Sequence, residues 1–151
     1  MQEDIKKFAK ELLGKIGIES EVYVECEKQG EEEVYKVKID SPKEAGLLIG
    51  AQGSTLFAIQ SFLAMAVKQK RGEWVRIVVD IGNWRQKAES QLTSLALAAA
   101  ERARSTGKPQ PLYNLTPSQR RIVHLALLNE PGVTTESEGE GSSRYLLVKA
   151  V

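Results

Sequence analysis

Two groups of residues in this sequence have the types and spacing to bind or transform a ligand, and the first contains Arg120 and His124. They stand four positions apart, so both side chains project from one face if the segment is helical. A guanidinium offers a rigid set of donors to phosphate or carboxylate, and an imidazole can donate to phosphate or stack on a base. Arg121 would lie on the adjacent face. The spacing fits equally an ordinary surface arginine with a histidine packed against neighbouring strands.

The second group is the tetrapeptide Gly50-Ala51-Gln52-Gly53, between two segments with helical apolar spacing. Two glycines three positions apart let the chain reverse direction where a Cβ would clash. Such a turn leaves backbone N–H groups free at the start of the following helix, where the helix dipole favours an anion such as phosphate. A plain turn between two helices contains the same pattern, so the flanking elements must identify it.

The side chains needed for catalysis or metal binding are scarce. His124 is the only histidine and Cys26 the only cysteine, which excludes an internal disulfide and a zinc site built from cysteine or histidine. A hydrolase needs a nucleophile, a base and an orienting group within reach, and no such motif surrounds His124. The acidic residues within 136–140 do not match a calcium-binding loop. We expect no enzyme activity, no metal and no cofactor. A hydrolase that uses His124 is kept as an alternative hypothesis.

Charge is segregated along the chain although the net charge is only +1. Residues 1–44 carry 12 acidic and 8 basic side chains, net −4. Residues 45–129 carry 4 acidic and 11 basic side chains, net +7, and residues 130–151 are net −2. A basic middle region favours a polyanionic partner, although an ordinary solvated surface can show the same distribution.

The overall composition is typical of a protein that folds in water, with 27% charged and 42% hydrophobic residues. No continuous apolar run approaches the ~18 residues that a membrane-spanning helix needs. The first four residues, Met-Gln-Glu-Asp, are acidic and do not resemble a secretory signal. We expect a cytoplasmic location without membrane insertion.

Hydrophobic periodicity predicts six elements in residues 1–82, in the order α-β-β-α-α-β. The expected helices cover residues 3–16, 42–49 and 54–70, and the expected strands cover 21–27, 35–40 and 75–81. Ser41 and Glu44 have the spacing of a capping box that would begin the second helix. We expect Cys26 to lie in the core, and Phe57 and Phe62 to widen the buried face of the third helix.

The remaining residues predict a long helix over 84–104, with Ala88, Leu92, Leu95 and Ala99 in line on its buried face. A short extended piece, a helix capped by Thr116 and Gln119, and two strands follow, over residues 111–114, 117–128, 133–137 and 144–151. We place the domains at residues 1–82 and 83–151, with the long helix as connector. Trp74 and Trp84 flank the third strand of the first domain, where they either pack or stack on nucleic acid.

The order of these elements, with Ile49 to Gly53 between two helices, resembles a type II KH domain, an α+β fold whose three-stranded sheet has helices on one face. The segment Arg120–Leu127 and the following residues 131–141 resemble an R-three-H domain, a small α/β domain with a small sheet and two helices. In tandem, the two resemble the bacterial Jag family, also called SpoIIIJ-associated or KhpB-like proteins.

This resemblance implies a non-catalytic protein that binds RNA or single-stranded nucleic acid. In KH domains the glycine-bounded loop clamps the backbone of about four nucleotides. Carried over, the nucleic-acid-binding residues are Gly50, Ala51, Gln52 and Gly53 in the first domain, and Arg120, His124 and the neighbouring Arg121 in the second. The family is linked to cell elongation and division, which suggests a post-transcriptional regulator, and to a small KH-domain partner protein.

The sequence departs from the family pattern in two ways. Family members often carry a further N-terminal domain, whereas this sequence begins at the KH region. Many KH loops have lysine or arginine between the glycines, whereas this loop has Ala51 and Gln52. Lys68, Lys70 and Arg71 cannot substitute directly, because they lie roughly 20 Å further along the helix. We therefore expect weak binding by the KH half alone; the alternative is a module that pairs with another KH protein and has vestigial nucleic-acid binding.

Overall fold

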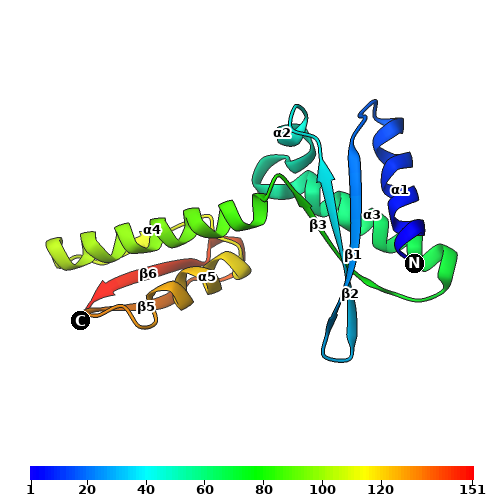
Figure 1. Ribbon diagram of the computed structural model, residues 1–151. Coiled ribbons are helices and arrows are strands. Elements are labelled where there is room, and N and C mark those ends of the chain that lie inside the picture. The colour runs from blue at the N-terminus through cyan, green and yellow to red at the C-terminus, as the bar shows by residue number, and fades with distance from the viewer. The chain divides into compact units, whose positions relative to one another are not determined.

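The computed structural model describes all residues, 1–151, and the chain divides into two compact units, Met1–Arg85 and Gln86–Val151 (Figure 1). Each unit has its own three-stranded sheet and its own cluster of buried hydrophobic side chains. The mixed α+β class predicted from the sequence is confirmed.

The first unit has the predicted order of elements and one sheet. Its elements are α1 (Gln2–Lys15), β1 (Glu21–Gln29), β2 (Glu32–Asp40), α2 (Ala45–Ile49), a 3₁₀ turn (Ala51–Gly53), α3 (Ser54–Arg71) and β3 (Arg76–Ile81). The strand order is β1-β2-β3, with β1 antiparallel and β3 parallel to β2. Antiparallel strands can be joined by a tight turn, whereas the parallel pair needs the longer connection through α2 and α3.

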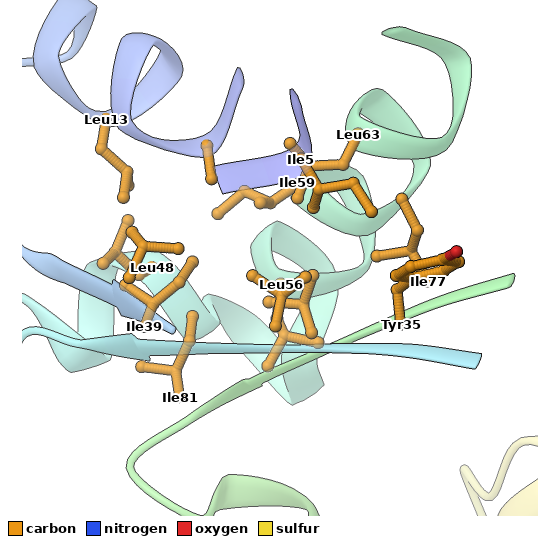
Figure 2. Close-up of a cluster of buried hydrophobic side chains, with 14 of the residues drawn as sticks. Ile5, Leu13, Tyr35, Ile39, Leu48, Leu56, Ile59, Leu63, Ile77 and Ile81 are labelled. Carbon is orange, nitrogen blue, oxygen red and sulfur yellow. The ribbon is translucent and has the colours of Figure 1, made fainter. Parts of the chain in front are cut away.

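Helices α1 and α3 cover one face of this sheet, and alternate strand residues point toward them (Figure 2). Ile39, Ile77 and Ile81 from the strands pack with Leu56 and Leu63 from α3. Full burial of one such side chain contributes about 1.5–3 kcal/mol relative to exposure. The core therefore fixes the position of α3, whose first residue directly follows the glycine-bounded tetrapeptide.

Two core predictions for this unit are wrong. Cys26 is exposed, as is every residue of β1 from Glu25 to the β1–β2 turn. In Figure 1 the end of this hairpin extends past the helices. Phe57 and Phe62 are 43% and 42% exposed, because α3 presents a different stripe to the sheet. The buried residues of that stripe are Leu56, Ile59, Leu63 and Val67.

The predicted capping box before α2 does not form. Helix α2 begins at Ala45, and residues 42–44 make a turn instead of a first helical turn. The buried Ser41 hydroxyl donates to the Glu44 carboxylate over 2.7 Å, so neither side chain caps a backbone N–H group. The helix before the tetrapeptide is consequently only five residues long.

One segment, Ala45–Arg71, is long and apolar enough in composition to cross a membrane, although it contains no continuous apolar run of that length. The segment is interrupted at Gly50 and at Gln52, where the backbone leaves helical geometry. Its residues Leu48, Leu56 and Leu63 lie in the core of the first unit, whereas Phe57, Phe62 and Met65 are exposed.

The long helix α4 (Trp84–Thr106) begins within the last residues of the first unit and continues into the second. The second unit contains, after α4, the elements β4 (Gln110–Leu112), α5 (Pro117–Leu127), β5 (Val133–Glu138), a 3₁₀ turn (Gly141–Ser143) and β6 (Tyr145–Ala150). The strands are antiparallel in the order β4-β6-β5. Helices α4 and α5 pack on the same face of this sheet, so the predicted small sheet with two helices is confirmed.

The buried face of α4 agrees with the predicted one at Ala99, which is buried, and at Leu92, which packs against the core, but not at Leu95 or Ala88. The side chains that α4 buries are all alanines, at positions 96, 99, 100 and 103. Leu95 is 39% exposed and Ala88 is only half-buried, so both lie off this face.

The start of α5 is as predicted. The Gln119 backbone N–H donates to Thr116 Oγ1 over 3.2 Å, and the Thr116 backbone N–H donates to Gln119 Oε1 over 2.8 Å. With Pro117 at the first helical position, this complete capping box fixes the first turn of α5. Arg120 follows one residue later, so the cap sets where the basic side chains of α5 emerge.

Candidate nucleic-acid interface

The tetrapeptide forms a tight turn with three of its four residues at positive φ. Gly50, Gln52 and Gly53 have φ values of 72°, 52° and 82°. Glycine adopts this region without a steric penalty, whereas a residue with a Cβ such as Gln52 is strained there. The turn therefore depends on its surroundings to keep Gln52 in this conformation.

Two of the four backbone N–H groups in the turn are available to a ligand. The amide of Gly50 donates to the Gly46 carbonyl over 3.0 Å, and that of Gly53 donates to the Gly50 carbonyl over 3.4 Å. The amides of Ala51 and Gln52 make no hydrogen bond within the chain, and both residues are exposed. The turn thus offers a narrower donor set than four free amides.

Two hydroxyl groups next to the turn were not among the predicted site residues. A Cβ added at Gly50 would lie 2.8 Å from Ser54 Oγ and still closer to Thr55 Oγ1, so both hydroxyls gather over this glycine. Hydroxyls can donate to phosphate oxygens and partly compensate for the lack of lysine or arginine in the turn. Their position at the start of α3 was the sequence signal that could have identified them.

Gly53 is buried against Trp84, the first residue of α4. A Cβ at Gly53 would lie 2.8 Å from Cζ3 and 2.9 Å from Cζ2 of the indole ring, and closer still to Cη2. Packing thus explains why position 53 is a glycine. A substitution such as Gly53→Asp would therefore disturb packing as well as charge. Trp84 is half-buried, in agreement with a packing role, whereas Trp74 is 65% exposed.

The basic end of α3 is occupied by contacts within the chain. Lys70 and Arg71 both pair with the carboxylate of Asp4 in α1, and Lys68 donates to the Gly72 carbonyl. The hydrogen bonds from Lys70 and Arg71 lower the pKa of Asp4 to about 2. These cations hold α1 to α3, in keeping with the expectation that they do not serve the turn directly.

In the second unit, the three predicted side chains come together around one open depression of about 480 Å³. Arg120, Arg121 and His124 line it from α5. The same depression is also lined by Thr135 and Ser137 of β5, by Arg144 just before β6, and by Pro117 and Leu146. The helical spacing therefore predicted a real cluster, although it did not include the contribution of the strands.

Arg120 and His124 are held in defined orientations. Arg120 Nη1 donates to the Leu115 carbonyl over 2.7 Å and to the Arg144 carbonyl over 3.3 Å, which leaves the other guanidinium nitrogens for a ligand. His124 is exposed, and its Nδ1 lies 2.5 Å from Thr135 Oγ1. Since no hydrogen bond within the chain uses Nε2, this nitrogen is available for recognition.

Arg144 is a basic residue of this depression that the sequence-based prediction missed. Its Nε donates to Ser137 Oγ over 2.8 Å, and it forms no ion pair. The sequence pattern that could have identified it is the alternation along β6. Leu146 and Val148 are buried against the helices, and Arg144, two positions before Leu146, lies on the same face.

The same alternation separates the acidic residues from this basic cluster. Glu136 and Glu138 of β5 both pair with Lys149, at 2.5 Å and 3.5 Å. Ser137, between them, points to the opposite face of the strand, where it meets Arg144. Three guanidinium groups consequently surround the depression without a carboxylate partner, an arrangement that suits a phosphate.

The fold and the two sites define a tandem protein, with a KH domain followed by an R-three-H domain. Residues 3–81 match the family described as "KhpA/KhpB, KH domain", and residues 90–150 match the R-three-H domain family. Because the first match covers more than half of the chain, the chain belongs to the KhpA/KhpB KH-domain family, and the predicted Jag-family membership is confirmed.

Several curated proteins are similar to this chain, and each carries the name RNA-binding protein KhpB. The protein from Clostridium symbiosum is 27% identical over 148 residues, which cover 98% of this chain and 65% of that protein. The protein from Bacillus subtilis (strain 168) is 32% identical over 108 residues, covering 70% of this chain and 52% of that protein. The chain therefore spans between about half and two-thirds of the length of these relatives.

Proposed function

We propose that this chain binds RNA, or another single-stranded nucleic acid, and catalyses no reaction on it. The observation that carries the proposal is the convergence of Arg120, Arg121 and Arg144 on one depression without a carboxylate partner. Unpaired guanidinium groups in a shared site repel one another, and an anionic ligand relieves this repulsion. The name of the relatives, RNA-binding protein, supports a phosphodiester backbone as that ligand.

The proposed first contact is the turn Gly50–Gly53. The free amides of Ala51 and Gln52, at the start of α3, are suited to one phosphate group. Because no lysine or arginine lies between the glycines, we propose that residues 1–82 bind weakly alone and that residues 83–151 supply much of the affinity. Two linked weak sites can exceed either affinity by a factor of about 10² or more.

Absence of catalysis is part of the proposal. The hydrogen bond between His124 Nδ1 and Thr135 Oγ1 is the one pairing in the depression with a base next to a hydroxyl. A nucleophile and base of this kind usually need a third group that orients the imidazole, and Nε2 has no such partner within the chain. We propose that Thr135 orients the ring for binding and that incubation with RNA yields no cleavage product.

The cellular role that we propose follows the family resemblance: a cytoplasmic post-transcriptional regulator linked to cell elongation or division. Membership of the KhpA/KhpB KH-domain family supports this role. Crosslinking of bound RNA in cells, followed by sequencing, tests it. The role predicts enrichment of messages whose products act in elongation or division, and recovery of RNA in simple proportion to its abundance would contradict it.

The experiment that tests the binding proposal is a salt titration with fluorescently labelled single-stranded RNA. The double variant combines Arg121→Ala with His124→Ala, both exposed in the depression. Arg120 is left in place because it also binds the Leu115 and Arg144 carbonyls, so its removal would change packing as well as charge. The matched control is Arg102→Ala, an exposed arginine of the same unit that does not line the depression.

We expect the parent to show a linear loss of log affinity with log salt, with a slope near −0.7 per phosphate contact. The double variant should bind at least about tenfold more weakly, with a shallower slope and an unchanged melting temperature. The control Arg102→Ala should lose less affinity, because it removes one charge that is remote from the depression. Equal losses for the double variant and the control would contradict the proposed site.

A second function is supported by one observation, the exposed apolar residues of α3. Phe62 and Met65 stand three positions apart on this helix and are both exposed, Met65 by 54%. An exposed apolar stripe of this kind suits a protein partner, for which the family description suggests another KH protein. Size-exclusion chromatography with light scattering, with and without RNA, distinguishes a self-associating or partner-binding module from a monomer that enlarges only with RNA.

A further inference from the structure

The contact between Gly53 and Trp84 joins the proposed phosphate-binding turn to the first residue of α4. Gly53 has a φ of 82°, and the outer edge of the indole ring occupies the space where a side chain would begin. Gln52, the residue before it, has a φ of 52° although it carries a Cβ. Such a conformation persists only where surrounding structure enforces it, and the indole is the bulky group in contact with the turn.

The indole ring is itself held in place from α3. The rings of Phe57 and Trp84 meet edge to face, with centroids 6.1 Å apart and an interplanar angle of 81°. This is a favourable geometry for two aromatic rings. The guanidinium of Arg85 lies 5.2 Å from the centre of the Phe57 ring, so Phe57 is fixed from a second direction.

Arg85 then anchors the start of α4 to the edge of the sheet. Its Nε donates to the Val79 carbonyl over 2.8 Å, and its Nη2 donates to Gln60 Oε1 over 2.8 Å. Gln60 Oε1 also accepts from the Val79 backbone N–H over 3.1 Å. The first two residues of α4 are therefore bound to β3 and α3, and the position of Trp84 is determined by the core of the first unit.

We propose that Trp84 is a positioning residue of the first binding site, which keeps the turn in the conformation that presents the Ala51 and Gln52 amides to a phosphate. This inference rests on the proposed function, because it assumes that the turn binds nucleic acid. It adds the first turn of α4, outside residues 3–81 that match the KH family, to the machinery of that site. Trp84 acts through Gly53 and makes no contact with the ligand.

The test is a double-mutant cycle on RNA affinity that uses charge at position 51 as the probe. Ala51 is exposed, so Ala51→Lys and Ala51→Asp change the charge next to the phosphate site without a packing change. The affinity of Ala51→Lys for one labelled single-stranded RNA is divided by that of Ala51→Asp. This ratio measures how close position 51 is held to a phosphate. We expect this ratio to be about tenfold or more when Trp84 is present.

The ratio is then measured again with Trp84→Ala and, as a matched control, with Trp74→Ala, which removes the exposed tryptophan. If Trp84 positions the turn, the ratio falls below about threefold in Trp84→Ala and stays at its original value in Trp74→Ala. A ratio unchanged by Trp84→Ala in a folded protein would overturn the inference. Thermal unfolding must show that Trp84→Ala is folded under the binding conditions, because an unfolded first unit would also bring the ratio toward one.

Trp84→Phe covers the case in which Trp84→Ala does not fold. The phenyl ring retains the aromatic contact with Phe57 but is too short to reach Gly53 as the indole does, so the ratio should again fall. An undiminished ratio in this variant would equally overturn the inference. If the ratio is near one even with Trp84 present, the turn does not face a phosphate, and it is the proposed function of the turn that fails.

Discussion

Nη1 of Arg120 donates a hydrogen bond of 3.3 Å to the backbone carbonyl of Arg144, a residue 24 positions further along the chain. One arginine of the basic depression thus binds the backbone from which a second one projects. The side chain of Arg144 is tied in turn to Ser137 of β5. The depression is therefore built from one helix and two strands, and a direct hydrogen bond connects Arg120 to Arg144.

Arg144→Ala is expected to weaken RNA binding and to leave the fold intact. The variant removes one unpaired guanidinium but keeps the backbone carbonyl that Arg120 binds. We expect about tenfold weaker binding at low salt and a salt slope shallower by about 0.7, the value for one lost contact to a single strand. Anisotropy titrations at several salt concentrations measure both quantities. An unchanged slope would remove Arg144 from the site.

The glycine at position 50 is expected to be required for stability of the first unit. Its φ of 72° is unfavourable for a residue with a Cβ, and a Cβ there would meet Ser54 and Thr55. We predict that Gly50→Ala lowers the free energy of unfolding by about 1–3 kcal/mol. The matched control is Gly46→Ala in α2, where a Cβ meets nothing within 4 Å.

Gly46→Ala should be neutral or stabilising by up to about 1 kcal/mol, because alanine favours helix over glycine. Urea unfolding followed by circular dichroism measures both variants. If Gly50→Ala were as stable as the parent, the turn would have to adopt a conformation other than the one described.

The ion pairs of Asp4 with Lys70 and Arg71 are expected to make the first unit sensitive to acid. These partners lower the pKa of Asp4 from 3.8 to about 2 in the folded protein. The stabilisation is therefore fully present above pH 3.8, and it is lost as the pH falls toward 2. We predict that the parent is more stable than Asp4→Asn at pH 5–7 and that this difference shrinks steadily from about pH 4 to pH 2.

Thermal unfolding of the parent and Asp4→Asn across this pH range checks the prediction. Repeating the series at high salt provides the control, because screening should reduce the difference at neutral pH. A difference that is independent of pH would show that Asp4 acts through something other than its charge.

The sequence predicted the order and type of most elements because hydrophobic periodicity is clear in them, as in β3, whereas β4 has only three residues and was expected as a short extended piece. The capping box of Thr116 and Gln119 was predictable because its partners lie within one helical turn. Ser41 and Glu44 have the same spacing, but their side chains bond to each other, a competition that depends on the burial of Ser41.

The predictions of buried residues and of site residues were wrong or incomplete where a side chain's position depends on contacts between distant segments. Phe57 was assigned to the core from its position on α3, whereas it packs against Trp84 and Arg85 at the edge of the unit. Arg144 was missed because no local spacing relates it to Arg120 or Ser137. The predicted residues of α5 were found together because a single helix positions them, whereas the strand residues of the same depression required the fold.

We propose that RNA binds at the turn of the first unit and at the basic depression of the second. A titration of the ¹⁵N-labelled chain with unlabelled single-stranded RNA, followed by two-dimensional NMR, tests this claim most directly. We expect saturable shifts of the backbone amides of Ala51 and Gln52, and of residues around His124 and Arg144. Shifts confined to the exposed stripe of Phe62 and Met65, or no shifts at either proposed site, would contradict it.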